Sequence, residues 1–217
     1  MTVVGRRTML GDAAFLMREF ARQPGVVGAL APSSPHLAAA ITATIPRFGD
    51  PVVVELGPGT GTFTAAIQAR LGTRGRHIAV ELNPRLATLT ASRHRSVDMV
   101  RASADRLPQI LADREISHAD LIISGLPWVS MSASVAEGAL DAVKNVLAPS
   151  GAFTTFGYTL VRGLAPGRRF RRMLTARFEE VVVGRTVVRN LPPAFVYYAR
   201  RPGLTAPAPP RSPECPD

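Results

Sequence analysis

The sequence predicts an α/β domain built on one mostly parallel β-sheet with helices on both faces. Between residues 52 and 201, short apolar runs alternate with helix-like segments, which is the pattern of successive β–α–β units. A glycine-rich turn follows the first apolar run. The last two runs are joined by a short segment with two prolines, which leaves no room for a helix. These two strands should therefore form an antiparallel hairpin at the sheet edge.

The expected elements follow one another regularly along the chain. Seven strands are expected near Val52–Leu56, His77–Leu82, Val97–Arg101, Asp120–Ser124, Ala152–Tyr158, Glu180–Val188 and Pro193–Arg200. Helices are expected near 62–71, 84–93, 133–147 and 166–177. Ahead of the sheet, residues 12–23 have the apolar spacing of an amphipathic helix. A Pro-Ser-Ser-Pro turn then supplies Ser33 or Ser34 as the cap of a second helix from about His36.

The length of 217 residues predicts one domain with decorations. We expect this domain to span 1–201, with an N-terminal helical part at 1–48 and the sheet-containing core at 49–201. The segment 202–217 has prolines at six of its sixteen positions and no apolar periodicity. This composition predicts a disordered tail.

The composition limits the compartment and the partners. Basic residues outnumber acidic ones by 26 to 16, which gives a net charge of +10 and favours an anionic partner. A membrane surface and a nucleic acid both fit this charge. No apolar run reaches the ~18 residues of a membrane span, and the first residues do not resemble a secretory signal. We therefore expect a cytoplasmic protein.

Metal and cysteine chemistry are not expected. The single cysteine, Cys215, lies in the expected tail, and the four histidines show no metal-ligand spacing. No Ser-His-Asp order or paired carboxylates suggest covalent or acid–base catalysis.

The glycine-rich turn at 57–61 predicts a nucleoside-like ligand. Gly57, Gly59 and Gly61 permit positive φ values and let the backbone approach a ligand, while the next helix presents unpaired N–H groups. The G-x-G-x-G spacing differs from that of dinucleotide enzymes. Glu55, just before the turn, would repel a pyrophosphate and suits a cationic ligand. Glu81, at the end of the second strand, is placed to accept hydrogen bonds from ribose hydroxyls.

Two stretches resemble the first and second motifs of the class I S-adenosylmethionine-dependent methyltransferases: ELGPGTG at 55–61 and VELNP at 80–84. The resemblance covers roughly 50–200 and implies a Rossmann-like fold with S-adenosyl-L-methionine as cofactor. Two groups are most similar, the bacterial phospholipid N-methyltransferases and the rRNA adenine dimethyltransferases. The stretch VGALAPSS at 27–34 looks especially like the phospholipid enzymes.

The resemblance implies a set of cofactor-binding residues. Where both groups usually show Gly-Asp-Ala after the third strand, this chain has Ala-Ser-Ala, so either Ser103 or Asp105 could contact adenine. The full expected cofactor set is Ser33, Ser34, Glu55, Gly57, Gly59, Gly61, Thr62, Glu81, Leu82, Ser103, Ala104, Asp105 and Ser124.

The loop after the fourth strand is the expected acceptor site. Ser124, Gly125, Leu126, Pro127 and Trp128 occupy the place of the Asn-x-Pro-aromatic loop of nitrogen methyltransferases, and the phospholipid enzymes carry the same Gly-Leu-Pro. Such a loop holds a neutral amine so that its lone pair faces the sulfonium methyl. The Trp128 ring could stack on an adenine, hold an alkylammonium by cation–π attraction, or pack in the core. Tyr158, at the end of the fifth strand, is a further expected acceptor contact.

The segment 162–177 carries six arginines with apolar residues interleaved, as a basic amphipathic helix would. Such a face suits anionic headgroups, RNA phosphates or plain solvation. We expect an N-methyltransferase of a phospholipid amine such as phosphatidylethanolamine, acting peripherally at the inner membrane face. The alternatives are an rRNA adenine-N6 methyltransferase, a small-molecule amine methyltransferase and a binding protein without catalysis. The sequence does not predict the oligomeric state.

Overall fold

The structure is a computed structural model that describes residues 33–203. The helix expected at 12–23 and most of the expected tail lie outside the described residues. Pro202, assigned to the tail from its composition, is described as the last residue of a strand and pairs with Phe178.

Seven strands form one sheet, as the alternating pattern predicted. The strands are β1 (Val52–Leu56), β2 (Arg76–Glu81), β3 (Asp98–Arg101), β4 (Ala119–Ser124), β5 (Leu147–Tyr158), β6 (Phe178–Val183) and β7 (Ala194–Pro202). Their order across the sheet is β3-β2-β1-β4-β5-β7-β6. The first five strands are parallel, and β7 runs antiparallel to both β5 and β6. The expected hairpin at the sheet edge is thus confirmed.

The described helices include four that the sequence predicted after residue 50. These are α3 (Thr62–Leu71), α4 (Pro84–Arg93), α6 (Ala133–Val146) and α7 (Ala165–Thr175). The second N-terminal helix is α2 (Pro35–Ile41), and Ser34 caps it by accepting a hydrogen bond from Leu37 N. The structure adds α5 (Leu107–Ala112) and the short 3-10 helices η1 (Ala104–Arg106) and η2 (Thr159–Val161), which the sequence analysis did not predict.

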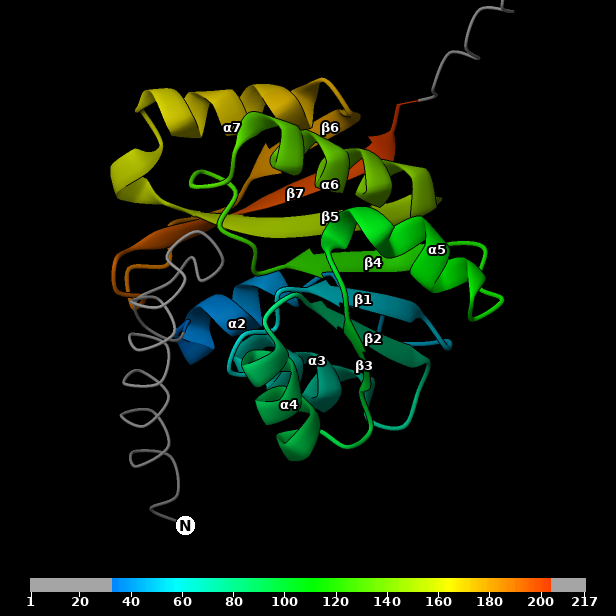
Figure 1. Cartoon of the computed structure of the whole chain (residues 1–217). Coiled ribbons are helices and arrows are strands. Elements are labelled where there is room, and N and C mark those ends of the chain that lie inside the picture. The colour runs from blue at the N-terminus through cyan, green and yellow to red at the C-terminus, as the bar shows by residue number, and fades with distance from the viewer. Residues whose placement is uncertain (1–32, 204–217) are drawn as a thin grey trace, which may run out of the picture.

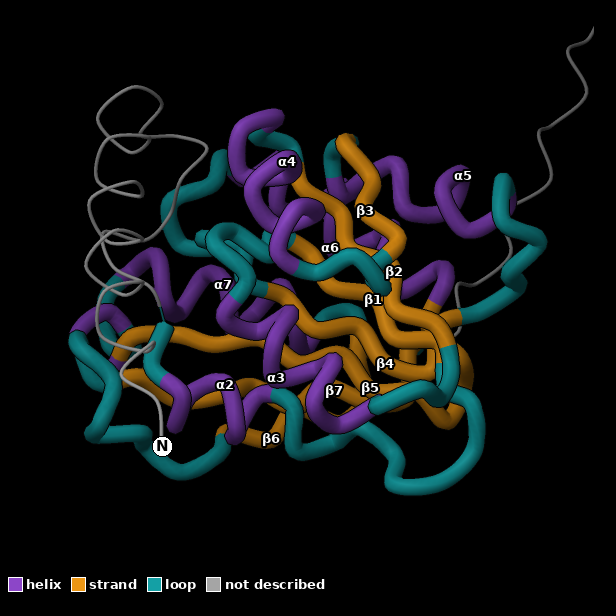
Figure 2. Tube along the Cα trace, turned by 90° about the horizontal axis from the view of Figure 1, so that it is seen from below, coloured by secondary structure: helices purple, strands orange, loops and turns teal. Residues whose placement is uncertain are grey.

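The sheet separates two hydrophobic cores because successive strand side chains point to opposite faces. On one face, Val53 of β1 and Leu121 of β4 pack with α2 and α3. On the other face, Val54 and Ile122 pack with α5, α6 and α7. Figures 1 and 2 show these helices covering the sheet on both sides. Strands covered on both faces explain why their sequences are almost continuously apolar.

The register of the parallel strands brings three loops to one edge of the sheet. Leu56 at the end of β1 pairs with Val80 of β2 on one side and with Ser124 of β4 on the other. The carboxyl ends of β1, β2 and β4 therefore coincide, on the left of the view in Figure 1, where β4 ends. In open α/β sheets this edge is where ligands bind.

Candidate active site

The glycine-rich turn between β1 and α3 has a backbone that requires glycine. Gly57, Gly59 and Gly61 have φ values of 69°, 61° and 93°. These values lie in the left-handed region, where a side chain would be strained. Gly61 is the N-cap of α3 and offers no side-chain cap to its first N–H groups. The turn thus presents backbone donors at the carboxyl edge of the sheet.

The turn packs directly against the loop that follows β4. A Cβ on Gly57 would lie 2.9 Å from Leu126 Cδ2, and a Cβ on Gly125 would lie 2.6 Å from Gly57 O. Gly125 N donates a hydrogen bond to Leu56 O at 2.7 Å. In contrast, a Cβ on Gly59 would meet no heavy atom within 4 Å. Gly59 therefore borders open space that a ligand can enter.

Glu81 joins the end of β2 to the glycine-rich turn. Its Oε2 accepts a hydrogen bond from Gly59 N at 3.1 Å, and its Oε1 accepts one from Asn83 N at 2.9 Å. Burial raises the pKa of Glu81, although these two amide hydrogen bonds act in the opposite direction. The residue is 5% exposed. Each carboxylate oxygen has a second lone pair, so Glu81 can also accept hydrogen bonds from a ligand at this edge.

Glu55 lies buried beneath the turn beside His77, one of the four histidines without metal-ligand spacing. Glu55 Oε2 accepts a hydrogen bond from Thr64 Oγ1 at 2.8 Å and lies 3.2 Å from His77 Nε2. His77 Nδ1 lies 2.8 Å from Gln68 Nε2. Because an amide NH₂ only donates, His77 Nδ1 is the acceptor there, which leaves the ring proton on Nε2. Among the described residues, Nε2 has no hydrogen-bond partner despite its closeness to Glu55. Within residues 33–203, Glu55 Oε1 has no hydrogen-bond partner.

The residues after β2 and β3 form the side of the turn where adenine contacts were expected. Leu82 is 53% exposed, which is unusual for a leucine beside a buried strand end. Ser103 and Ala104 are half-buried at the start of η1. Asp105 is exposed, and its Cβ lies 3.9 Å from the place of a Cβ on Gly138 in α6. Ser103 is thus the less exposed of the two residues expected to contact adenine, and the choice between them stays a prediction.

The loop after β4 is held in place by a hydrogen-bond network around Ser124. Ser124 Oγ accepts from Leu126 N at 3.2 Å and from Trp128 Nε1 at 3.1 Å. The same indole N–H lies 3.0 Å from Thr155 Oγ1, and that hydroxyl donates to Ser124 O at 3.1 Å. Ser124 is fully buried. The hydroxyl thus holds the loop in place, and a contact of Ser124 with the cofactor or the acceptor stays a prediction.

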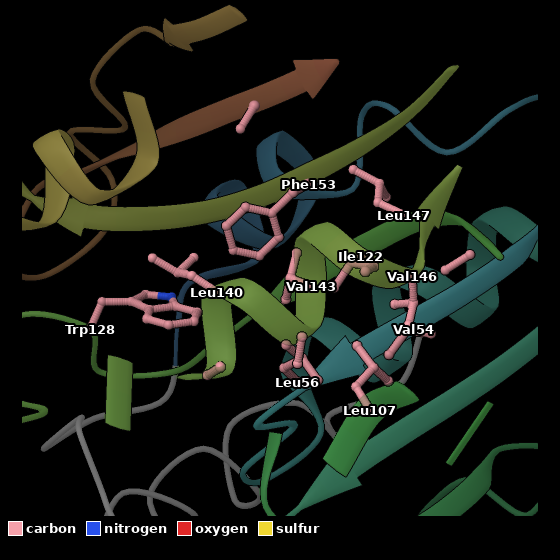
Figure 3. Packing of buried hydrophobic residues seen from close by; sticks show 14 of the residues in the cluster. Val54, Leu56, Leu107, Ile122, Trp128, Leu140, Val143, Val146, Leu147 and Phe153 are labelled. Atoms are coloured by element: carbon pink, nitrogen blue, oxygen red, sulfur yellow. The ribbon is translucent and has the colours of Figure 1, made fainter. Parts of the chain in front are cut away.

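Of the three positions considered for the Trp128 ring, the structure shows the one packed in the core. The residue is 2% exposed. Its ring stacks on Phe170 with centroids 5.4 Å apart and meets Phe153 edge to face at 6.0 Å. Figure 3 shows the indole lying among the core residues beside Leu140 and Phe153. The ring packs in the core because its apolar body can be buried while its N–H finds two acceptors in the loop.

The remaining expected site residues lie at the same edge. Tyr158, half-buried at the end of β5, packs edge to face on Phe156 at 5.5 Å, and burial raises its pKa. Ser34 N donates to Asn190 Oδ1 at 2.9 Å, and its hydroxyl caps α2. Ser33 is half-buried before that cap, and Thr62 is the first residue of α3. The structure thus gives Ser34 a capping role that requires no cofactor.

Comparison with known proteins decides the family. A family model described as "Methyltransferase domain" matches residues 53–151. A relative from Singulisphaera acidiphila, named ornithine lipid N-methyltransferase, is 36% identical over 195 residues, which covers 87% of this chain and 96% of the relative. The chain is a class I S-adenosylmethionine-dependent methyltransferase. The relation to rRNA adenine dimethyltransferases suggested by the sequence motifs is not supported by these matches.

Solved structures confirm the Rossmann-like fold of this methyltransferase. A TehB-like S-adenosylmethionine-dependent methyltransferase from Corynebacterium glutamicum has a TM-score of 0.58 at 14% identity, covering 87% of this chain and 98% of that one. Human methyltransferase-like protein 13, in complex with S-adenosylhomocysteine, has a TM-score of 0.57 at 18% identity. The coverage in that case is 81% and 83% of the two chains.

The residues at the carboxyl edge fit the cofactor of this family, S-adenosyl-L-methionine. The open space at Gly59 admits a ligand against the backbone, and the free Oε1 of buried Glu55 lies below the same turn. Residues 33–203 contain no cluster of His, Cys, Asp or Glu that could hold a metal ion. No helix in this part of the chain is long and apolar enough to cross a membrane.

The sequence did not indicate several residues that contact the expected site residues and hold them in place. His77 and Thr64 reach Glu55 from β2 and α3, and Thr155 reaches the loop after β4 from β5. Thr90 of α4 donates to Gly59 O at 2.7 Å and so fixes the turn from outside. Isolated threonines and histidines in a helix or strand carry no local signal of such a role, because their partners come from distant segments.

Proposed function

We propose that this methyltransferase transfers a methyl group to the amine of a lipid headgroup. The observation that carries the proposal is the relative named ornithine lipid N-methyltransferase, which aligns over 87% of the chain. The ornithine side chain ends in a primary amine, and phosphatidylethanolamine presents the same group. We therefore commit to the class of amine-bearing lipids, in which phosphatidylethanolamine is one candidate substrate.

In this proposal the cofactor occupies the open space beside Gly59. The backbone of the turn and the start of α3, from Gly57 to Thr62, bind it closely, and Glu81 accepts hydrogen bonds from its ribose hydroxyls. Leu82, exposed at the end of β2, packs on the adenine ring, with Ser103 and Ala104 on its other side. Glu55 contributes negative charge below the cationic part of the ligand. Bound S-adenosylmethionine supplies a methyl group activated on a sulfonium.

The acceptor amine is positioned by the loop after β4. Trp128 N donates to Leu126 O, and Ser130 N donates to Pro127 O, so those two carbonyls are engaged. The Gly125 carbonyl has no such donor within residues 33–203, and it lies beside the glycine-rich turn. It can accept a hydrogen bond from the neutral amine and aim the nitrogen lone pair. Tyr158 borders the same space. The protein contributes mainly by positioning, which can supply several kcal/mol of the barrier.

The exposed arginines of α7 support action at a membrane surface. Arg168, Arg171 and Arg172 are exposed, whereas Phe170 and Leu174 of the same helix are buried in the core. The helix is thus anchored by its apolar side and presents charge outward, which suits anionic headgroups. The same arginines would also attract RNA phosphates, so ribosomal RNA is one of the acceptors in the test.

The proposal is tested by asking which acceptor pool gains label from radiolabelled S-adenosylmethionine. Purified protein is incubated separately with ornithine lipid, with phosphatidylethanolamine, with ribosomal RNA and with small soluble amines. We expect label in a lipid pool, and none with the Gly59→Arg variant. Label in the RNA or soluble pool alone would overturn the lipid assignment.

A further inference from the structure

Four large apolar side chains are exposed in two segments that flank the proposed acceptor site. Leu160 and Leu164 are 72% and 55% exposed, and Val188 and Leu191 are 74% and 87% exposed. Single exposed leucines are common on protein surfaces. Four of them in two neighbouring segments form a group, which we call the apolar rim.

The two segments are joined at the carboxyl edge of the sheet. The first follows β5 directly, and the second leads into β7, which runs back along β5. Thr159 donates to Pro193 O through both its N–H, at 3.0 Å, and its hydroxyl, at 3.1 Å. Figure 1 shows the yellow segment after β5 and the orange segment before β7 together on the left, where β4 also ends. The apolar rim thus lies on the same edge as the Gly125 loop.

The charge around the apolar rim has one sign. Residues 159–177 contain six arginines and no acidic residue, and residues 184–193 contain two arginines and no acidic residue. Arg162, Arg168, Arg185 and Arg189 all lie at least partly exposed in these segments. The Arg162 guanidinium lies 5.1 Å from the Phe195 ring centroid, so this charge is held against the fold at the rim.

We propose that the apolar rim and its arginines form a docking surface for an anionic lipid bilayer. This inference rests on the proposed function, because it explains how a lipid amine reaches the Gly125 loop without leaving the membrane. Leucine and valine side chains would enter the headgroup–acyl boundary, while the arginines contact anionic headgroups. Residues 1–32 also contain more arginine than acid, with four against two. Because this segment carries the same sign of charge as the rim, an anionic membrane is favoured over residues 1–32 as the partner that covers the apolar rim.

The test compares vesicle binding of a rim variant with that of a matched control. The rim variant is Leu191→Ser with Arg185→Gln. The control is Phe48→Ser with Arg47→Gln, because Phe48 is also 87% exposed but precedes β1 at the opposite edge of the sheet. Full-length proteins are sedimented with vesicles of phosphatidylcholine and phosphatidylglycerol, and with pure phosphatidylcholine. The melting temperature and S-adenosylhomocysteine affinity, which both variants should keep, report folding.

The wild type and the control should bind the anionic vesicles and be released by high salt. The rim variant should bind at least about tenfold more weakly, which corresponds to about 1.4 kcal/mol. The proposal is overturned if the wild type does not bind, if the two variants lose binding equally, or if the rim variant binds like the wild type. It is also overturned if light scattering shows a wild-type dimer that only the rim variant dissociates, because the rim would then be a subunit interface.

The acceptor assay separates this proposal from the proposed function. If no lipid pool is labelled but the rim variant alone loses vesicle binding, the lipid acceptor is wrong and the docking surface stands. If lipid in detergent micelles is labelled and vesicle binding does not depend on the rim, the docking surface is wrong and the acceptor stands.

Discussion

A comparison of two glycines, one in the glycine-rich turn and one outside it, can distinguish a loss of ligand binding from a loss of stability. Gly59 and Gly49 both have a positive φ, 61° and 76°, and a Cβ added to either would meet no heavy atom within 4 Å. Gly59→Ala and Gly49→Ala should therefore each destabilise the fold by a similar ~1–2 kcal/mol. Only Gly59→Ala should weaken S-adenosylhomocysteine binding, by at least about tenfold, because the methyl enters the proposed ligand space. Calorimetry on both variants measures this difference, and equal affinities would place the cofactor elsewhere.

Trp128 tests whether the acceptor loop depends on its hydrogen-bond network. Trp128→Ala should cost about 3–5 kcal/mol of stability, because it removes a buried aromatic side chain. Trp128→Phe keeps much of the packing but leaves Ser124 Oγ and Thr155 Oγ1 without their indole donor. We expect Trp128→Phe to lower the methyl transfer rate more than it lowers S-adenosylhomocysteine affinity. A Trp128→Phe enzyme with the wild-type rate would show that the indole N–H does not position the loop.

From the buried position of Glu81 we predict that the free energy of unfolding and the cofactor affinity change in opposite directions with pH. Burial raises the pKa of Glu81 above its ordinary value of 4.5. Protonation of Glu81 therefore stabilises the cofactor-free fold, and this contribution to the free energy of unfolding is lost as pH rises through the raised pKa. The ionised form accepts the ribose hydrogen bonds, so S-adenosylhomocysteine affinity should fall as pH drops through the same value, by up to about tenfold per pH unit. Glu81→Gln should remove both trends. Titration calorimetry across mildly acidic pH tests this, and a pH-independent wild-type affinity would contradict it.

At the scale of elements, variants of Ser34 at the N-terminus of α2 can distinguish a helix-capping role from a contact with the cofactor. Ser34 Oγ accepts the Leu37 N–H, so Ser34→Ala should cost about 1 kcal/mol of stability, and Ser34→Asp should retain most of it. Both variants should bind S-adenosylhomocysteine like the wild type, because capping requires no ligand. Denaturant unfolding with and without S-adenosylhomocysteine checks this. A selective loss of affinity in Ser34→Ala would instead support the cofactor contact that the sequence motif suggested.

The helices and strands were largely predictable because their signals are local. The helix expected at 62–71 begins after Gly61 and ends at Leu71 before Gly72, and the helix at 84–93 has Asn83 as its cap and a proline at its start. By contrast, α5 has six residues, too few for its apolar spacing to be distinguished from a loop. Cap residues mark a helix wherever they occur, whereas such a short helix depends on packing against α6.

The candidate site was predictable only for the residues whose role is set by the backbone. Gly57, Gly59 and Gly61 could be assigned from their spacing, because positive φ values leave a glycine signature. Trp128 could not be placed, since an aromatic residue after a strand can face a ligand or the core. Its burial depends on Phe170 and Thr155, which come from α7 and β5 and are far away in the sequence. The Glu55–His77 contact likewise joins two strands and has no local signal.

At the scale of the whole molecule, the two edges of the sheet have different chemistry. The carboxyl edge combines the glycine-rich turn, the Gly125 loop, and the apolar rim with its arginines, whereas the sheet faces are closed by two hydrophobic cores. In the proposed function, the cofactor and a lipid amine meet at this edge, with the cofactor beside β1 and β2 and the lipid beside β5 and β7. This arrangement requires the docking surface and the acceptor loop to face the same bilayer.

The central claim, that the chain N-methylates a lipid amine, is tested most directly by the lipids of a cell that expresses it. The host should be a bacterium whose lipids bear no N-methyl groups but include ornithine lipid and phosphatidylethanolamine. Mass spectrometry of its lipid extract should show new species heavier by one or more methylene units, with fragments that place the added mass on the amine headgroup. The Gly59→Arg variant, expressed at the same level, should give none. An unchanged lipid profile in cells that contain folded wild-type protein able to bind S-adenosylhomocysteine would contradict the claim.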